Sequence, residues 1–276
     1  MGLACTLSVS SCASGGRSEQ ILVQGTVWQP DGATVHPKGQ WHHLGARKLL
    51  IQWSIVDAVA FVSGTSVPVA EPLPDWGRIA KEPWAQEVIL GLAGHFDENV
   101  SRSDLPRLIS LSQQLTQLPT PLNVVGWYFP VEVDPTWREA HLLAKYFEQL
   151  PRPLWISAYD SANLGADALA DSLATWLPAD VGVFFQDGVG IHARSAAVAV
   201  RYADVLVARL GVHRVKIIAE AFRPKIGGGF RSATAAELLS QLSLYKNHGV
   251  YLFDGPHYVP DTLVNELLQS MSMPTK

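Results

Sequence analysis

Cysteine is scarce in this chain: only two of its 276 residues are cysteine, and both lie in the first twelve positions, at Cys5 and Cys12. The chain after position 12 therefore has no thiol for a disulfide, a cysteine zinc site or a cysteine nucleophile. Basic charge is also limited, since 21 lysines and arginines face 25 acidic residues and leave a net charge of −4. A nucleic-acid binder needs a basic face, so we expect no nucleic-acid partner.

Long apolar runs and the common cofactor motifs are missing as well. After the first segment, no stretch reaches the ~18 uninterrupted apolar residues of a membrane-spanning helix. The sequence contains no GxGxxG, GxSxG or HExxH, and Gly227-Gly228-Gly229 is not followed by the Lys-Ser/Thr of a phosphate-binding loop. We therefore expect no cofactor and no metal ion, and we disfavour a serine hydrolase.

The first segment, residues 1–20, differs in composition from the rest of the chain. Residues 1–16 are uncharged, small or apolar, and the sequence Val9-Ser10-Ser11-Cys12 resembles the lipobox of bacterial lipoproteins. The resemblance implies that Cys12 is lipidated and that the protein is lipid-anchored to a bacterial membrane, in the periplasm or on the cell surface. The alternative is a plain disordered tail.

The remaining residues, 21–276, are typical of one domain in which eight strands alternate with helices. Continuous apolar runs rich in Val, Ile, Phe and Trp indicate strands that are buried on both faces, as in a parallel sheet. We predict strands at 21–28, 48–56, 87–93, 122–129, 153–159, 181–186, 215–220 and 250–254, with helices at 102–118, 134–150, 165–177, 192–210, 232–248 and 260–271. This pattern predicts an α/β fold of the (β/α)8 TIM-barrel type. The alternative, an open doubly wound sheet, often has a glycine-rich first turn that this sequence lacks.

In a TIM barrel the active site lies at the carboxyl ends of the strands, and aromatic residues recur there in this sequence. Aromatic faces stack on the C–H faces of sugar rings, while amides and carboxylates bond the hydroxyl groups. We therefore predict saccharide-binding residues at Trp28, Trp53, Trp127, Tyr128, Tyr159, Gln186, Asp187 and Phe222. Ordinary core packing is the alternative for the tryptophans, and a simple turn is the alternative for Asp187-Gly188.

Carboxylates also gather at these strand ends. Burial and mutual repulsion raise carboxyl pKa values, so one such group can stay protonated near neutral pH. Glycosidic cleavage needs a carboxylic acid of this kind and a second carboxylate as nucleophile or base. We predict Glu132, after the fourth strand, as the acid and Glu220, at the end of the seventh, as the nucleophile. A salt bridge from Glu220 to Arg223 or Lys225 is the structural alternative.

An acid on the fourth strand and a nucleophile on the seventh resemble clan A of the retaining glycoside hydrolases. That clan usually has Asn-Glu at the end of strand four, whereas Pro130-Val131 precede the glutamate here. The order GWYFPVEVD, FFQDGVG, IIAEAF and YLFDGPHY is similar to an uncharacterised bacterial family of glycoside-hydrolase-like TIM barrels, whose members are similar to enzymes encoded near exopolysaccharide genes. The resemblance points to the following residues: Tyr128, Glu132, Gln186, Asp187 and Glu220.

These observations together predict a glycoside hydrolase, of the retaining type, that acts on a bacterial exopolysaccharide or related glycan. We expect it to be a monomer and to reach a membrane only through its lipid. The alternative is a non-catalytic barrel that binds glycan for an exopolysaccharide synthesis or export complex. Release of reducing ends from a polysaccharide would separate the two.

Overall fold

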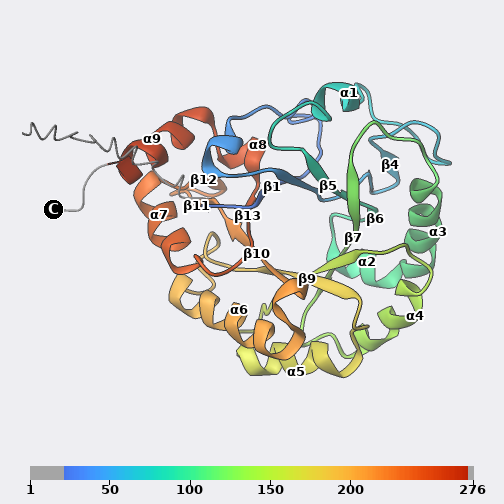
Figure 1. The fold of residues 1–276 in the computed structure, drawn as a ribbon. Coiled ribbons are helices and arrows are strands. Elements are labelled where there is room, and N and C mark those ends of the chain that lie inside the picture. The colour runs from blue at the N-terminus through green and yellow to red at the C-terminus, as the bar shows by residue number, and fades with distance from the viewer. Residues whose placement is uncertain (1–21, 273–276) are drawn as a thin grey trace, which may run out of the picture.

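The structure is a computed structural model that describes residues 22–272, and within this range eight parallel strands close into a barrel (Figure 1). Around the barrel they follow the order β1-β13-β10-β9-β8-β7-β5-β2. The predicted TIM-barrel fold is confirmed. The lipobox and Cys12 lie outside the described residues.

The strands of the barrel are β1 (Gly25–Trp28), β2 (Lys48–Ile51), β5 (Glu87–Gly91), β7 (Val124–Val133), β8 (Leu154–Ala158), β9 (Val181–Gln186), β10 (Val215–Glu220) and β13 (Val250–Phe253).

Helices surround most of the barrel, but not the part that follows its first two strands (Figure 1). After β1 there is only a 3-10 helix, Trp41–Leu44. After β2 come β3 (Ile55–Val56), β4 (Val59–Ala60) and a four-residue helix α1 (Trp76–Ile79), and β3 and β4 form a small sheet with β6 (Ala93–Gly94), which follows β5. In the described range, no helix is long and apolar enough to cross a membrane. The surrounding helices are α2 (Glu98–Ser103), α3 (Leu105–Thr116), α4 (Leu143–Phe147), α5 (Ala166–Trp176), α6 (Ala196–Leu210), α7 (Ala235–Leu244) and α9 (Asp261–Ser272).

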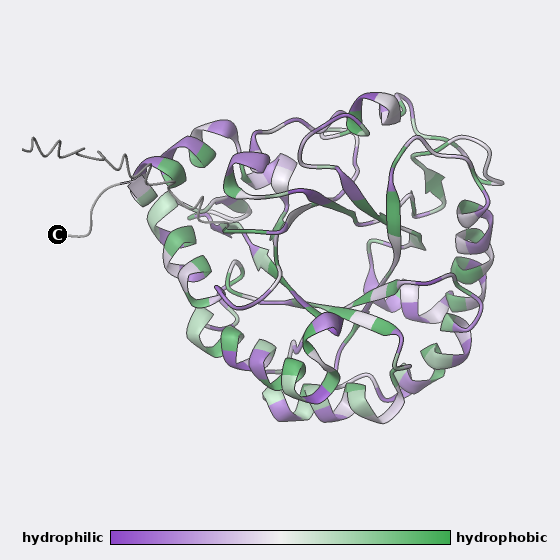
Figure 2. Ribbon diagram, in the orientation of Figure 1, coloured by the Kyte–Doolittle hydropathy of each residue, from purple (hydrophilic) through white to green (hydrophobic). Residues whose placement is uncertain are grey.

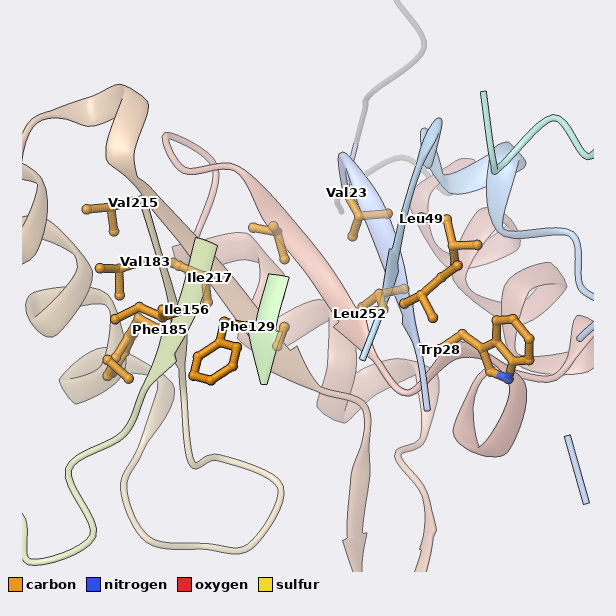
Figure 3. Close-up of a cluster of buried hydrophobic side chains, with 14 of the residues drawn as sticks. Val23, Trp28, Leu49, Phe129, Ile156, Val183, Phe185, Val215, Ile217 and Leu252 are labelled. Atoms are coloured by element: carbon orange, nitrogen blue, oxygen red, sulfur yellow. The ribbon is translucent and has the colours of Figure 1, made fainter. Parts of the chain in front are cut away.

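The larger core lies between the barrel and the helices. Outward-facing strand residues such as Val183, Ile217 and Leu252 have no exposed surface and belong to one buried cluster with helix residues (Figure 3). The helices carry both hydrophobic and hydrophilic residues along their length, as an amphipathic covering layer requires (Figure 2). Burial on both strand faces explains why the strands read as continuous apolar runs rather than as alternating patterns.

A second core fills the inside of the barrel. It contains the inward-facing residues of successive strands, and because side chains alternate along a strand, the next inward position in each lies nearer the carboxyl end. The inward-facing positions of a strand therefore continue from the inner core toward its carboxyl end. They continue from Tyr128 to Glu132 on β7, from Phe184 to Gln186 on β9 and from Ile218 to Glu220 on β10. The apolar layer consists of Val27, Leu50, Ile89, Tyr128, Phe184, Ile218 and Tyr251.

Three predicted elements differ from the structure. The predicted fourth strand, 122–129, continues to Val133, so Glu132 lies within β7 rather than after it. The predicted strand 48–56 is divided, because the chain leaves the barrel after Ile51 and enters the small sheet at β3. The predicted helix 134–150 is replaced by a 3-10 helix, Arg138–Leu142, followed by α4. The side chain of Asp134 accepts hydrogen bonds from the N–H groups of Thr136 and Ser161, so it stabilises a turn and the helical segment begins later.

Candidate active site

A cavity opens inside the barrel at the carboxyl ends of the strands. Its empty volume is about 450 Å³. Apolar side chains from the inner core form part of its lining, and the remaining lining groups include two carboxyls, two amides and two hydroxyls. The residues that line it are Val27, Leu50, Gln52, Glu98, Tyr128, Pro130, Glu132, Ser157, Gln186, Ile218 and Phe253.

Strand β7 positions Glu132 through an irregularity at Pro130. The pairing of β7 with β8 passes from Phe129 opposite Ile156 to Glu132 opposite Ser157, so two residues of β7 are not paired. Proline has no N–H to donate to the ladder, and bulges near active sites re-aim side chains. Both Pro130 and Glu132 consequently face the cavity. The departure from the Asn-Glu pattern of clan A thus coincides with a bulge that aims the glutamate inward.

The carboxyl group of Glu132 lies among few hydrogen-bond donors. Its Oε2 accepts a short hydrogen bond from Nε2 of Gln186, whose amide also donates to Oγ of Ser157 at 3.3 Å. Burial, and then the negative charge of Glu98, raise the pKa of Glu132 to about 8. Glu132 therefore carries its proton at neutral pH, which is the state that a general acid requires.

Glu98, at the start of α2, is a site residue that the sequence analysis missed. It lines the same cavity as Glu132, and its Oε2 accepts the backbone N–H of Glu132 at 3.0 Å. Burial raises its pKa, while the Glu132 N–H group and the charge of Arg102 oppose the rise. Glu98 lies past the third strand in a polar segment, so only the folded chain brings its carboxyl beside that of Glu132.

Glu220 ends β10 and is 6% exposed. Its Oε2 accepts the backbone N–H of Ile191 at 3.1 Å, from the loop that follows β9. A Cβ atom on Gly190 would lie only 2.6 Å from the Cβ of Glu220, so this close approach requires glycine. Burial and the charge of Asp187 raise the pKa of Glu220, and the N–H groups of Ile191 and Gly190 oppose the rise.

The alternative prediction of a salt bridge at Glu220 is wrong. Among the described residues, no ion pair involves Glu220. The guanidinium of Arg223 instead donates to the backbone oxygen of Glu220 at 3.1 Å and to Oε1 of Gln241 at 2.7 Å. Lys225 lies in the exposed turn between β11 (Phe222–Pro224) and β12 (Phe230–Ser232). The carboxylate of Glu220 is therefore not neutralised by a basic side chain.

Asp187 does not face the cavity, which corrects its predicted role in binding sugar hydroxyls. Because side chains alternate, Gln186 points into the barrel and Asp187 points away from it. Asp187 has no exposed surface. Its carboxylate accepts hydrogen bonds from the N–H groups of Val189 (3.1 Å) and Glu220 (3.2 Å), Nε2 of Gln241 (2.5 Å) and the hydroxyl of Tyr245 (3.0 Å). With its oxygens occupied in this way, Asp187 holds the backbone N–H of Glu220 in place and does not reach the cavity.

Three predicted aromatic residues lie at or near the opening of the barrel at the carboxyl ends of its strands, here called the mouth. Tyr128 lines the cavity, and its phenol is hydrogen-bonded to Ser157. Tyr159 is half-buried, with the guanidinium of Arg194 4.9 Å from its ring centre. Burial raises the pKa of Tyr159, and so do the charges of both Glu220 and Glu132. Phe222 is buried in an aromatic group, with its ring centroid 4.7 Å from that of Phe230.

Three predicted tryptophan platforms lie elsewhere. Trp28 has no exposed surface and packs in the outer core, where its ring centroid is 5.6 Å from that of Trp76. Trp53 is 4% exposed, and its indole N–H donates to the backbone oxygen of Pro30. Trp127 packs against the outer core from the face of β7 opposite to Tyr128. Trp28 and Trp127 point outward from their strands, and Trp53 lies after β2 in a small cluster with Val35 and Phe61, so none of the three lines the cavity.

The site offers no group of residues suited to a metal ion. Within the described residues, no three His, Cys, Asp or Glu side chains are arranged to hold one. His257 pairs with Asp254 and Asp31 at 3.1 and 3.0 Å, and neither it nor its partners line the cavity.

Comparisons with known proteins agree with the fold. No protein-family model matches the sequence, and no curated protein matches it. Among solved structures, a candidate alpha-L-fucosidase from Bacteroides thetaiotaomicron VPI-5482 aligns with a TM-score of 0.60 and 14% identity over 98% of each chain. A chitinase from Chromobacterium violaceum ATCC 12472 aligns with a TM-score of 0.51 and 10% identity, over 91% of this chain and 100% of the other. These likenesses show a shared barrel fold.

Proposed function

We propose that this protein is a glycoside hydrolase with Glu132 as the general acid and base and Glu220 as the nucleophile. The observation that carries the proposal is the state of Glu132, which lines the barrel cavity and has a pKa of about 8 because of burial and Glu98. A carboxyl group that is protonated at neutral pH and faces a cavity at the strand ends suits protonation of a glycosidic oxygen.

The proposed reaction uses the two glutamates in turn. Glu132 gives its proton to the glycosidic oxygen while a carboxylate oxygen of Glu220 attacks the anomeric carbon, and the bond to the leaving group breaks. The glycosyl–enzyme ester is then hydrolysed by a water molecule, whose proton passes to the Glu132 carboxylate as the Glu220–sugar bond breaks. The negative charges of Glu220 and Glu132 both raise the pKa of Tyr159. This supports a placement of the two glutamates around one part of the opening at the carboxyl end of the barrel.

The electrostatics fit this division of roles. Glu220 must be ionised to attack; the N–H groups of Ile191 and Gly190 favour its ionised form, while burial and the charge of Asp187 favour the protonated form. Glu132 must be protonated, and the neighbouring charge of Glu98 favours its protonated form. The resemblance to clan A and the names of the two similar structures, a candidate alpha-L-fucosidase and a chitinase, support a glycan as substrate. We propose a bacterial exopolysaccharide or related glycan, retention of anomeric configuration, and a monomer that is lipid-anchored through Cys12 in the periplasm or on the cell surface.

The direct test is digestion of a panel of bacterial polysaccharides with the wild-type protein, Glu132→Gln and Glu220→Gln, with reducing ends measured over time. Wild type should release reducing ends from at least one glycan, and both variants should lose this activity while keeping the wild-type melting temperature within a few degrees. Full activity in Glu220→Gln would remove the nucleophile assignment, and no release by the wild type from any glycan would remove the hydrolase.

A glycan-binding barrel without catalysis is the second candidate. One observation favours it: the described residues that line the cavity include Glu132 and Glu98 but not Glu220, whose carboxyl lies under Gly190 and Ile191. If that loop keeps Glu220 from the sugar, the protein would bind glycan for a synthesis or export complex. Binding of a polysaccharide without release of reducing ends would establish this candidate.

A further inference from the structure

The loop after β9 divides three consecutive backbone N–H groups between two buried carboxylates. Val189 donates to Oδ1 of Asp187 at 3.1 Å, and Ile191 donates to Oε2 of Glu220 at 3.1 Å. The N–H of Gly190, between them, also favours the ionised form of Glu220. In addition, Oδ1 of Asp187 accepts the backbone N–H of Glu220 at 3.2 Å. One oxygen of Asp187 therefore ties the end of β10 to the loop that provides the donors for the Glu220 carboxylate.

The second oxygen of Asp187 faces α7 and the residue after it, and the side chains there fix its charge. Oδ2 accepts from Nε2 of Gln241 at 2.5 Å and from the hydroxyl of Tyr245 at 3.0 Å. Arg223 sets the orientation of the Gln241 amide, because a guanidinium can only donate and its Nη2 lies 2.7 Å from Oε1 of Gln241. Burial and the charge of Asp187 raise the pKa of the Tyr245 phenol, so Tyr245 keeps a proton to donate. The ionised carboxylate of Asp187 is the form that satisfies all of these donors.

The other charged and titratable groups around Glu220 come from β8, β11 and the loop between β9 and α6. Burial and the charge of Asp187 raise the pKa of Glu220, whereas the charge of Arg194 lowers it. Arg223 donates to the backbone oxygen of Glu220 at 3.1 Å rather than to its carboxylate. Burial raises the pKa of Tyr159, as does the charge of Glu220, so this phenol is neutral. Among these groups, Asp187 is the one whose negative charge opposes ionisation of Glu220.

We propose that Asp187 is a positioning residue for Glu220: it aligns the Glu220 carboxylate with the N–H groups of the loop after β9, and Gln241 and Tyr245 keep it ionised beside Glu220. This role rests on the proposed function, in which Glu220 is the nucleophile. Its consequence is that Glu220 is more basic than its N–H donors alone would make it, because a neighbouring negative charge disfavours a second one.

The test measures the protonation of Glu220 directly and needs no turnover. Protein labelled with ¹³C at the glutamate carboxyls is titrated by NMR, and the signal that is missing from Glu220→Gln identifies Glu220. In the wild type this signal should titrate above the ordinary value of 4.5, with a second, smaller step as Asp187 ionises. In Asp187→Asn the midpoint should fall by about 0.5–1 pH unit, because the neighbouring charge is gone.

A charge transposition answers the question even if Asp187→Asn alone is unstable. In the single variant the new amide meets the amide of Gln241, so that two donors face each other. Gln241→Glu supplies an acceptor for that amide and places the negative charge against the guanidinium of Arg223. The double variant Asp187→Asn/Gln241→Glu should therefore fold as the wild type does and still show a lowered midpoint for Glu220.

Asp160→Asn is the matched control. Asp160 also has no exposed surface, and its carboxylate accepts a tyrosine hydroxyl and two backbone N–H groups, those of Leu164 and Gly165. Removal of this charge should move the Glu220 midpoint far less than removal of the Asp187 charge, although the loss of a buried carboxylate is the same in kind.

The outcomes separate this role from the proposed reaction. On a glycan that the polysaccharide panel identifies, the acidic limb of kcat/KM should move to lower pH in both Asp187 variants, by the same amount as the NMR midpoint. A single titration step near 4.5 in the wild type, or a midpoint that stays in place in both variants, would overturn the positioning role. A midpoint that moves as expected in a protein that releases no reducing ends would leave the role of Asp187 standing and remove only the hydrolase.

Discussion

Glu132 and Glu220 are both buried glutamates at inward positions, on the fourth and seventh strands of the barrel, yet their hydrogen-bond donors differ. Glu132 is influenced by the carboxyl of Glu98 and accepts one side-chain hydrogen bond, from Gln186. Glu220 is influenced by the carboxyl of Asp187 and accepts the backbone N–H of Ile191 from the loop after β9, whose close approach requires glycine at position 190.

Burial raises the pKa of both groups, and a neighbouring carboxylate adds to the rise at each, Glu98 at Glu132 and Asp187 at Glu220. The two sites differ in the donors that oppose the rise, which are backbone N–H groups at Glu220 and the side-chain amide of Gln186 at Glu132. A pair of carboxyl groups whose environments separate their pKa values is the usual arrangement for an acid and a nucleophile. Each of the following predictions changes one side of this comparison.

The largest effect is expected from removing the acid. Glu132→Gln should lower kcat by about 10²- to 10⁴-fold on substrates with poor leaving groups, because general acid catalysis contributes that much. The loss should be much smaller for aryl glycosides with acidic phenol leaving groups, which need little protonation. The measurement is kcat across a series of leaving groups, with Glu266→Gln on α9 as the control. An equal loss on every leaving group would contradict the role of Glu132 as acid.

A smaller effect should follow from disturbing the loop that holds Glu220. Gly190→Ala places a Cβ 2.6 Å from that of Glu220, so the loop or the glutamate must shift. We expect a destabilisation of about 1–3 kcal/mol in urea unfolding and a fall in kcat. Gly32→Ala is the matched control, since a Cβ there would meet nothing within 4 Å. Unchanged stability and activity in Gly190→Ala would show that the loop does not fix Glu220.

Glu98→Gln should change the pH dependence without removing the reaction. The acid works only while protonated, so activity should fall as pH rises through the Glu132 pKa of about 8. Removing the negative charge of Glu98 lowers that pKa, and the basic limb of the kcat/KM profile should move to lower pH. The acidic limb should move less. A basic limb that stays in place would mean that Glu98 does not act on Glu132.

The last prediction concerns the stability of the fold. The pKa of Glu132 is about 8 in the folded protein against an ordinary value of 4.5, so folding favours the protonated form. Its contribution is fully present below pH ~4.5 and is lost as pH rises through about 8. Relative to the wild type, Glu132→Gln should therefore gain free energy of unfolding between pH 5 and pH 8.5, as measured by urea unfolding at each pH. A difference that does not vary with pH would contradict the raised pKa.

Sequence alone was enough for the barrel and for the positions of its eight strands, because strands buried on both faces leave apolar runs that stand out from amphipathic helices. The same continuous apolarity hides which face of a strand points inward. Trp28 and Trp127 were therefore predicted at the mouth, although both pack in the outer core. Asp187 was grouped with Gln186 for the same reason, since adjacent residues in a strand face opposite ways.

The remaining site residues depend on tertiary structure. Glu98 lies in a polar segment where a carboxylate is unremarkable, and only the closure of the barrel sets it against the N–H of Glu132 at 3.0 Å. The bulge at Pro130 could be predicted from the sequence, because a proline within a strand indicates an interruption of the hydrogen bonds to the neighbouring strand.

The most direct test of the account is to identify the residue that becomes glycosylated. The wild-type protein would be incubated with a 2-deoxy-2-fluoro glycosyl fluoride of the sugar that the polysaccharide panel identifies, then digested and mapped by mass spectrometry. We predict one added sugar mass on the peptide that contains Glu220. A label on Glu98, or continued turnover with no labelled peptide, would contradict the assignment of Glu220 as the nucleophile.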